Sequence, residues 1–331
     1  MTTALLDSAL VRTAGGARTL REEVLRGLRG APKVLPPKLF YDAEGARLFE
    51  RICALDEYYL TRAELEILEA RSGEIAALAG LGCALIEYGS GAGMKVRFLL
   101  DALVEPAAYI PIDISREQLS RVARELAARY PRVAVRPLCA DYTGQFRLPT
   151  VPHGARRLAF FPGSTIGNFH PAEAAAFLRR ICHSVGAEGA LILGIDRRKD
   201  AHDLDAAYND RAGATAAFNL NILTRLNREL GADFDLSRFR HRAFFDARIS
   251  RVEMHLESLE PQTVCVAGEA VMFERGETIW TECSYKYDRA RLEELVTSAG
   301  FTTTRLWTDA REQFWVAFLT PAQAARDGRE P

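Results

Sequence analysis

The sequence lacks the features that would place this chain in a membrane, on a nucleic acid or in the secretory route. It contains no run of about 18 apolar residues, which a membrane-spanning helix requires. Its first residues show no charged start followed by an apolar stretch, so no secretory signal is predicted. The formal net charge of -1 offers no basic surface to nucleic acid or to anionic lipid. We therefore expect a cytoplasmic protein with no nucleic-acid, membrane or obligate protein partner.

The metal-binding residue types also lack the spacing of a metal site. Six cysteines are scattered without a C-x-x-C pair, and the six histidines show no ligand spacing. Cysteines of this kind are expected to be reduced thiols rather than zinc ligands. The sequence therefore predicts no metal.

Apolar residues, in contrast, are abundant and follow an alternating order. They make up 48% of the 331 residues, enough for a sizeable core. From residue 84 to residue 195, apolar runs alternate with helical periodicity, which predicts an α/β fold with a parallel sheet and right-handed crossovers. The expected strands are 84–88, 108–112, 133–138, 157–161 and 189–195, and the expected helices are 95–104, 116–129 and 171–184.

The alternation of expected strands and helices stops after residue 196, where a helical stretch (203–230) precedes several antiparallel strands. The alternation resumes near residue 288 with a helix and two strands. Helical patterns also fill most of the first 79 residues, around a linker at 31–37. We therefore expect a sheet domain interrupted by a second lobe, which would lie over the carboxyl ends of the strands. The boundaries predicted are 60–196 and 287–320 for the sheet domain, 10–59 and 197–286 for the second lobe, 321–331 for a frayed tail, and 247–258, 263–273 and 278–287 for the strands of the lobe.

A glycine-rich turn after the first expected strand is the most informative motif. Gly89, Gly91 and Gly93 allow the backbone to turn tightly and to approach a ligand closely. The dinucleotide fingerprint Gly-x-Gly-x-x-Gly would need a glycine where Met94 stands. Glu87, just before the turn, is expected to repel a pyrophosphate. Both departures favour S-adenosylmethionine, which carries a sulfonium and no phosphate, over a nicotinamide dinucleotide.

Acidic residues follow the next two strands. Asp113 ends the second strand, where a carboxylate can take two ribose hydroxyls, and Ser115 is expected to cap the helix 116–129. Asp141 and Tyr142 follow the third strand. There the acid can accept from an adenine amino group while the ring packs beside it, or it is simply a solvated loop acid. The residues alone leave both interpretations open.

Further polar candidates lie in the loop after the fourth strand and on a strand of the second lobe. Asn168 suits a carboxylate or an amine, or stabilises its own turn. Glu282 and Ser284 are two residues apart on a strand and so share a face. That pair suits a polar or cationic group, or belongs to a solvent-facing surface. Met254 shares its face with apolar neighbours and is expected in the core or in a pocket wall.

Aromatic residues gather in the N-terminal segment. Tyr41, Phe49 and Tyr58, with Tyr59, either pack the lobe or form a wall around a cation, since aromatic faces attract quaternary ammonium groups. Tyr208 lies in a helical stretch rich in asparagine. It is placed to reach a substrate, although polar residues of such a stretch also bond across a lobe interface.

Taken in order along nearly the whole chain, these motifs resemble the histidine Nα-methyltransferases of ergothioneine biosynthesis, which use S-adenosylmethionine and form hercynine. Two departures are Tyr88, where the family usually has leucine, and Tyr142, where phenylalanine is common. The matching stretches are Phe40-Tyr41-Asp42, Glu57-Tyr58-Tyr59-Leu60-Thr61-Arg62, Gly89-Ser90-Gly91 with Lys95, Phe161-Pro162-Gly163-Ser164-Thr165-Ile166-Gly167-Asn168, Ala207-Tyr208-Asn209-Asp210, Glu253-Met254-His255-Leu256 and Thr281-Glu282 with Ser284-Tyr285-Lys286-Tyr287.

The resemblance implies a Rossmann-like class I methyltransferase sheet with an inserted α+β substrate-binding lobe, and trimethylation of the α-amino group of free histidine. Related transferases acting on another amino acid, such as tryptophan, and a cofactor-binding regulatory protein without turnover are the alternatives. By position, the implied cofactor residues are Glu87, Gly89, Ser90, Gly91, Lys95, Asp113, Ser115, Asp141 and Tyr142. Asn168 and Tyr208 would hold the histidine carboxylate, Tyr58, Met254, Glu282 and Ser284 would surround the imidazole, and Tyr41, Phe49 and Gly163 would lie near the reacting amine.

Overall fold

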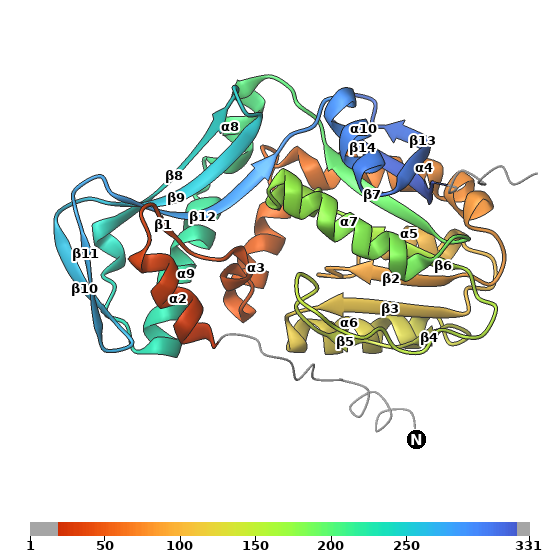
Figure 1. Ribbon diagram of the computed structural model, residues 1–331, viewed down its shortest axis with the longest axis horizontal. Helices are drawn as coiled ribbons and strands as arrows, with labels where there is room; N and C mark the ends of the chain where they lie inside the picture. The colour runs from red at the N-terminus through yellow and green to blue at the C-terminus, as the bar shows by residue number, and fades with distance from the viewer. Residues whose placement is uncertain (1–18, 323–331) are drawn as a thin grey trace, which may run out of the picture. The chain divides into compact units, whose positions relative to one another are not determined.

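The computed structural model describes residues 19–322, which divide into two compact units (Figure 1). Each unit is discontinuous in sequence. The first contains Ala63–Arg197 and the described residues from Tyr287 onward, and the second contains the described residues up to Arg62 together with Arg198–Lys286. Of the predicted segments, residues 10–18 of the second lobe and 323–331 of the frayed tail lie outside the described residues.

The first unit is built on an eight-stranded sheet with the order β13-β14-β7-β6-β2-β3-β4, and β5 pairs with β3 beside β4. The predicted parallel sheet is confirmed for β2 to β7, whereas β14 runs antiparallel to β7 and β13 antiparallel to β14. The strands are β2 (Ala84–Tyr88), β3 (Ala108–Asp113), β4 (Ala134–Val135), β5 (Leu138–Cys139), β6 (Arg157–Phe161), β7 (Ala190–Asp196), β13 (Phe301–Thr308) and β14 (Phe314–Pro321).

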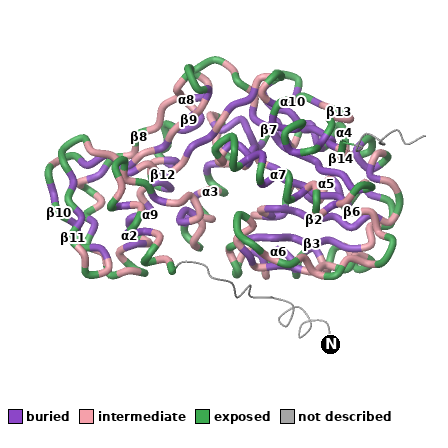
Figure 2. The backbone as a smooth tube through the Cα atoms, in the orientation of Figure 1, coloured by how far each residue is buried: buried purple, intermediate pink, exposed green. Residues whose placement is uncertain are grey.

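Helices cover this sheet, so its central strands are buried along their whole length (Figure 2). Burial on both faces is what gives parallel strands their continuous apolar sequences. In the first unit, α6 packs against β3 and β4, and α7 packs against β6 and β7. The helices are α4 (Tyr59–Ala79, which begins in the second unit), α5 (Lys95–Ala102), α6 (Arg116–Arg129), the 3₁₀ turn η2 (Thr165–Asn168), α7 (Pro171–Val185) and α10 (Arg289–Ser298).

The second unit combines a four-stranded sheet, ordered β1-β12-β9-β8, with the hairpin β10–β11 and several helices. One helix, α9, packs against β8 and β9, and α3 packs against α9. The strands are β1 (Lys33–Val34), β8 (Phe239–Asp246), β9 (Arg251–Ser258), β10 (Gln262–Val266), β11 (Glu269–Phe273) and β12 (Thr278–Tyr285). The helices are α2 (Leu20–Arg29), α3 (Ala43–Cys53), α8 (Ala201–Tyr208) and α9 (Ala214–Leu230), with the 3₁₀ turns η1 (Pro37–Phe40) and η3 (Leu236–Arg238).

Several predicted elements differ from the structure, each for a local reason. The expected strand 263–273 is the hairpin β10–β11, because Ala267 and Gly268 turn with φ of 51° and 83°. The expected strand 133–138 is split into β4 and β5 around Pro137, which has no N–H to give to a ladder. The expected helix 203–230 is interrupted before α9, where the Asp210 carboxylate accepts from the first backbone N–H groups of that helix.

Two strands of the second unit were not predicted. The sequence assigned residues 31–37 to a linker, yet Lys33–Val34 forms β1 and pairs in parallel with β12. The charged, non-alternating segment Phe239–Asp246 forms β8.

Among residues 19–322, no helix is long and apolar enough to cross a membrane. Within the same range, no cluster of three or more histidine, cysteine, aspartate or glutamate side chains is arranged to hold a metal ion. All six cysteines lie in the described part of the chain and are free thiols.

Candidate functional site

The glycine turn of the first unit has the backbone conformation that its sequence predicts. Gly89, Gly91 and Gly93 have φ values of 76°, 48° and 67°, a region that favours glycine. A Cβ atom on Gly93 would lie 2.5 Å from Val122 Cγ1 on α6, whereas nothing lies within 4 Å of the Cβ position of Gly91. Gly93 therefore allows the turn to pack on α6, and Gly91 leaves space beside the backbone.

Asp113, at the end of β3, is tied to this turn through both carboxylate oxygens. Oδ2 accepts from the Gly91 N–H at 3.0 Å, and Oδ1 accepts from the Ser115 N–H at 2.9 Å. Burial raises the pKa of Asp113, and the backbone N–H groups oppose that shift. Each oxygen of an ionised carboxylate has a second lone pair, so the group can still accept ribose hydroxyls. Ser115 is the N-cap residue of α6, as predicted, although its side chain makes no capping hydrogen bond.

Glu87 is buried in β2 and accepts a hydrogen bond from the Tyr109 hydroxyl of β3. Burial raises the pKa of Glu87 to about 8, although the nearby Lys95 lowers it. Burial therefore disfavours the ionised form of this carboxyl group. The raised pKa weakens the predicted repulsion of a pyrophosphate by Glu87, so the glycine spacing carries the main argument against a dinucleotide.

The surroundings of the turn fit a polar ligand with an aromatic part. The Ser90 hydroxyl is buried and has no hydrogen-bond partner within residues 19–322. The Tyr142 ring lies beside the turn, with its Cε1 atom 3.6 Å from the Cβ position of Gly89. Asp141 accepts from the Thr143 N–H at 2.9 Å and so stabilises its own turn. An unpartnered hydroxyl and a ring at one turn suit an adenosyl group.

Glu64, which the sequence analysis missed, joins two of the predicted residues of this unit. Its carboxylate is fully buried, lies 2.6 Å from Lys95 Nζ, and accepts from the Gly163 N–H at 2.9 and 3.0 Å. Position 194, which lies beside the Glu64 carboxylate, accepts only glycine, because a Cβ atom on Gly194 would lie 2.2 Å from Glu64 Oε1. A signal was present in the sequence, because Glu64 is an acid between the buried apolar positions 60, 63, 67 and 68 of α4.

Gly163 begins the loop that follows β6, at the carboxyl end of the strand where ligands of such sheets bind. Its φ is 76°, and the next residue, Ser164, has a φ of 56°. The Ser164 hydroxyl accepts from the Asp196 N–H at 2.8 Å, which fixes the loop to the end of β7. The loop then closes in η2, whose last residue is Asn168.

In the second unit, a β-bulge decides which face of β12 carries Glu282. Trp280 pairs with His255, but Glu282 pairs with Met254, so Thr281 is an extra residue on β12. Because of the extra residue, each side chain after the bulge lies on the opposite face of the sheet from the one that regular alternation would give it. Glu282 and Ser284 therefore lie together on the face of Met254, as their two-residue spacing predicted.

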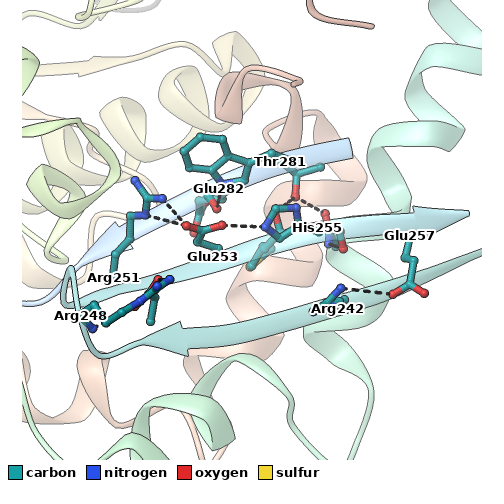
Figure 3. A network of polar contacts seen from close by, with 12 residues as sticks. Arg242, Arg248, Arg251, Glu253, His255, Glu257, Thr281 and Glu282 are labelled. Atoms are coloured by element: carbon teal, nitrogen blue, oxygen red, sulfur yellow. Dashed lines mark hydrogen bonds and ion pairs between the residues drawn. The ribbon is translucent and has the colours of Figure 1, made fainter. Parts of the chain in front are cut away.

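The bulge is held by α9. The Thr281 hydroxyl lies 2.8 Å from Asn219 Oδ1 and 3.0 Å from the carbonyl oxygen of Met254. The opposite face of the sheet has a different chemistry (Figure 3), since there Arg251 and His255 both bind Glu253. The bulge thus places the side chain of Glu282 on the face away from Glu253, while the Glu282 carbonyl oxygen accepts from Trp280 Nε1 at 2.8 Å.

Glu282 has the properties of a hydrogen-bond acceptor for a ligand. Within the described range, no protein group donates a hydrogen bond to its carboxylate. Burial raises the pKa of Glu282 to about 7, and the charge of Lys286 opposes the shift. An N–H group of a ligand would stabilise the ionised form.

Lys286 connects the other polar residues of this face and was also missed. Its side chain is fully buried, and Nζ lies 2.9 Å from Ser284 Oγ and 3.0 Å from the Tyr208 hydroxyl. The sequence held a signal, because an acid, a hydroxyl and a lysine alternate at 282, 284 and 286 and so share one face.

The predicted aromatic residues of the second unit form a continuous row. The ring centroids of Tyr41 and Phe49 are 6.0 Å apart, those of Phe49 and Tyr58 are 6.2 Å apart, and those of Tyr58 and Tyr208 are 6.3 Å apart. All three pairs meet edge to face, a favourable geometry for aromatic rings. Met254 is buried on the same sheet face as Glu282.

A family model described as a histidine-specific, S-adenosylmethionine-dependent methyltransferase matches residues 20–321. The chain belongs to this family. The predicted family, the enzyme class and the cofactor S-adenosylmethionine are thereby confirmed, and so is the Rossmann-like methyltransferase fold, whose sheet the structure contains.

Relatives cover most of the chain. It is 43% identical over 303 residues to histidine N-alpha-methyltransferase of Mycolicibacterium smegmatis, a match that spans 90% of this chain and 94% of the relative. It is 41% identical over 304 residues to the protein of the same name from Mycobacterium tuberculosis, with the same coverage. It is also 30% identical to ergothioneine biosynthesis protein 1 of Neurospora crassa, over 86% of this chain and 33% of that longer protein.

Proposed function

We propose that the protein transfers methyl groups from S-adenosylmethionine to the α-amino nitrogen of free L-histidine, and that three transfers give hercynine for ergothioneine biosynthesis. The observation that carries the proposal is the Glu282–Ser284 pair, which a bulge places on one face of β12 in a chain of the histidine-specific family. We also propose that the reaction takes place in the cytoplasm.

The first unit would bind the methyl donor. Asp113 would accept the ribose hydroxyls, Ser90 and the glycine turn would receive polar groups of the ligand, and Tyr142 would pack beside the adenine with Asp141 nearby. Lys95, held by Glu64, would offer a cation to the carboxylate of the methionine part. When bound, S-adenosylmethionine supplies an electrophilic methyl group on a sulfonium.

Histidine would be held mainly by the second unit. Glu282 would accept the imidazole N–H and Ser284 would contact the other ring nitrogen, while Met254 and Tyr58 pack against the ring. Tyr208 would bind the carboxylate, a role that the family resemblance also assigns to Asn168. A carboxylate beside a hydroxyl matches the two nitrogens of an imidazole, whereas an indole has one N–H and no bare nitrogen. The pair therefore favours histidine over tryptophan.

The transfer is a displacement in which the amine nitrogen forms a bond to the methyl carbon as the carbon–sulfur bond breaks. The amine must be neutral, and an α-amino pKa of about 8 makes deprotonation cost about 1 kcal/mol at pH 7. Orientation can supply roughly 7–11 kcal/mol of the barrier. The proton that the amine loses before each transfer would pass to water, so a dedicated base is not required, and the residues proposed beside the amine, Tyr41, Phe49 and Gly163, would mainly align it.

The aromatic row also suits the product. Each methylation makes the amine larger and, at the third step, permanently cationic. Aromatic faces attract quaternary ammonium groups, so Tyr41 and Phe49 would accommodate the growing cation.

The test is mass spectrometry of free histidine incubated with the protein and S-adenosylmethionine. We expect a product with three added methyl groups. In a mixture with tryptophan, only histidine should be methylated. Methylation of tryptophan alone would contradict the substrate assignment, and binding of the cofactor without release of S-adenosylhomocysteine would contradict the enzymatic one.

A further inference from the structure

We propose that Lys286 is a positioning residue that fixes the direction of the Ser284 hydroxyl, so that Ser284 donates to the bare nitrogen of the substrate imidazole. This inference rests on the proposed function. It adds the residue that keeps the Ser284 hydroxyl a hydrogen-bond donor toward the substrate.

The position of the Lys286 ammonium is closely determined. Its backbone N–H donates to the Ser250 carbonyl at 2.8 Å, and the Ser250 hydroxyl donates to the Lys286 carbonyl at 2.9 Å. The side chain is fully buried, and Nζ lies 4.9 Å from the centre of the Tyr208 ring in addition to its two hydroxyl contacts. A long flexible side chain is thus held with its nitrogen between Ser284 and Tyr208.

An ammonium group has three donors and no acceptor. At the Lys286–Ser284 contact of 2.9 Å, the ammonium must therefore donate and Ser284 Oγ must accept. A serine hydroxyl has a single proton, which must then point away from Lys286. Within residues 19–322, Ser284 Oγ makes no other hydrogen bond, so its proton is available to a ligand. By the same reasoning, the Tyr208 O–H points away from Lys286.

The donor role of the Ser284 hydroxyl complements the acceptor role of the Glu282 carboxylate. A neutral imidazole presents one N–H and one bare nitrogen. The ionised Glu282 can only accept and takes the N–H, while Ser284, kept as a donor, takes the bare nitrogen. Without Lys286 the Ser284 hydroxyl would rotate freely and would turn away from the ring for part of the time. The lysine therefore contributes to histidine affinity through Ser284, without touching the substrate ring itself.

The experiment measures histidine and S-adenosylhomocysteine binding to the full chain by calorimetry, for the wild type, Lys286→Met, Lys286→Gln, Ser284→Ala and the double variant Lys286→Met/Ser284→Ala. Loss of a charge-assisted hydrogen bond corresponds to about a 10- to 100-fold weaker Kd for histidine in Lys286→Met. The Kd for S-adenosylhomocysteine should stay within about 2-fold. Lys286→Gln keeps a donor and should recover part of the affinity.

The double variant separates positioning from a merely structural role. If Lys286 acts through Ser284, the effect of Lys286→Met should fall several-fold in the Ser284→Ala background, because interacting residues are not additive. A matched control is Lys33→Met, which removes another lysine of the same sheet that contacts an aromatic ring and an acid. It should leave histidine binding unchanged.

Full additivity of the two substitutions, or an unchanged Kd for histidine in Lys286→Met, would overturn the proposal. If Lys286→Met does not fold, Lys286→Gln decides, since a histidine affinity as low as that of Ser284→Ala would also overturn it. Methylation of histidine by the wild type distinguishes failure of the proposed function from failure of the role proposed for Lys286. If the wild type does not methylate histidine, the proposed function fails, whereas an active wild type with additive variants contradicts the role of Lys286 alone.

Discussion

Replacing Glu282 by glutamine should weaken histidine binding and at the same time stabilise the ligand-free protein above neutral pH. Glutamine keeps the size of the side chain and an acceptor oxygen but removes the charge. A hydrogen bond to a charged group is worth about 1.5–3 kcal/mol, so Glu282→Gln should raise the Kd for histidine roughly 10- to 100-fold. The Kd for S-adenosylmethionine should change little, because the proposed cofactor residues belong to the first unit.

The stability effect follows from the pKa of Glu282, which burial raises from 4.5 to about 7. The folded protein then binds more protons than the unfolded chain between these values, so wild-type stability falls as pH rises through this range. At one pKa unit per 1.36 kcal/mol, the ionised carboxylate costs about 3 kcal/mol at pH 8 and about 1 kcal/mol at pH 5. The advantage of Glu282→Gln over the wild type should therefore grow by about 2 kcal/mol from pH 5 to pH 8.

Urea unfolding at several pH values measures the stability difference, and calorimetry with each ligand measures the two affinities. Glu282→Ala is a useful companion, since it removes the acceptor as well and should bind histidine still more weakly. A pH-independent stability difference would refute the raised pKa. Equal losses of histidine and cofactor affinity would refute the assigned role of Glu282.

Three further substitutions test the first unit. Glu64→Gln should lower the free energy of unfolding by about 2–3 kcal/mol, because it breaks the ion pair with the partly exposed Lys95, while histidine affinity stays constant. Gly93→Ala should destabilise the protein by about 2–3 kcal/mol through a clash with α6, whereas Gly91→Ala, which has open space for a Cβ atom, should cost about 1 kcal/mol. Chemical denaturation of both variants measures the two losses of stability, and a larger loss for Gly91→Ala would contradict the prediction. Asp113→Asn can keep only one of the two backbone N–H bonds and should weaken cofactor binding about 10- to 100-fold, so an unchanged calorimetric Kd would exclude the role of Asp113.

The first unit was largely predictable from the sequence, and the reason is burial. Strands such as Ala84–Tyr88 and Ala190–Asp196 are covered on both faces, so each is a continuous apolar run with turn residues on either side. The second unit was less predictable. Its strand Phe239–Asp246 is only partly buried and rich in charge, and its strand Lys33–Val34 has two residues and depends on β12 for its pairing.

The candidate site was predictable where chemistry is local and unpredictable where it depends on contacts distant in sequence. The glycine turn, Asp113 and the Glu282–Ser284 spacing are local patterns. Glu64 contacts both Lys95 and Gly163, and Gly163 is 99 residues from Glu64 in the sequence, so no spacing rule could connect these residues. The raised pKa of Glu87 was not foreseen, because burial causes it against the opposing hydrogen bond from Tyr109, and the sequence displays neither contact.

The bulge at Thr281 means that the length of β12, and not only its composition, determines which face of the sheet carries Glu282 and Ser284. Side chains of a strand alternate with a period of two, so one residue fewer before Glu282 would exchange the two faces of everything that follows. The hydrogen-bonded ladder would survive, but the acid and the hydroxyl would face Arg251 and His255. If Glu282 and Ser284 bind histidine as proposed, a one-residue deletion at this point should leave a folded protein that no longer binds histidine, an effect not expected of a single substitution of a surface residue.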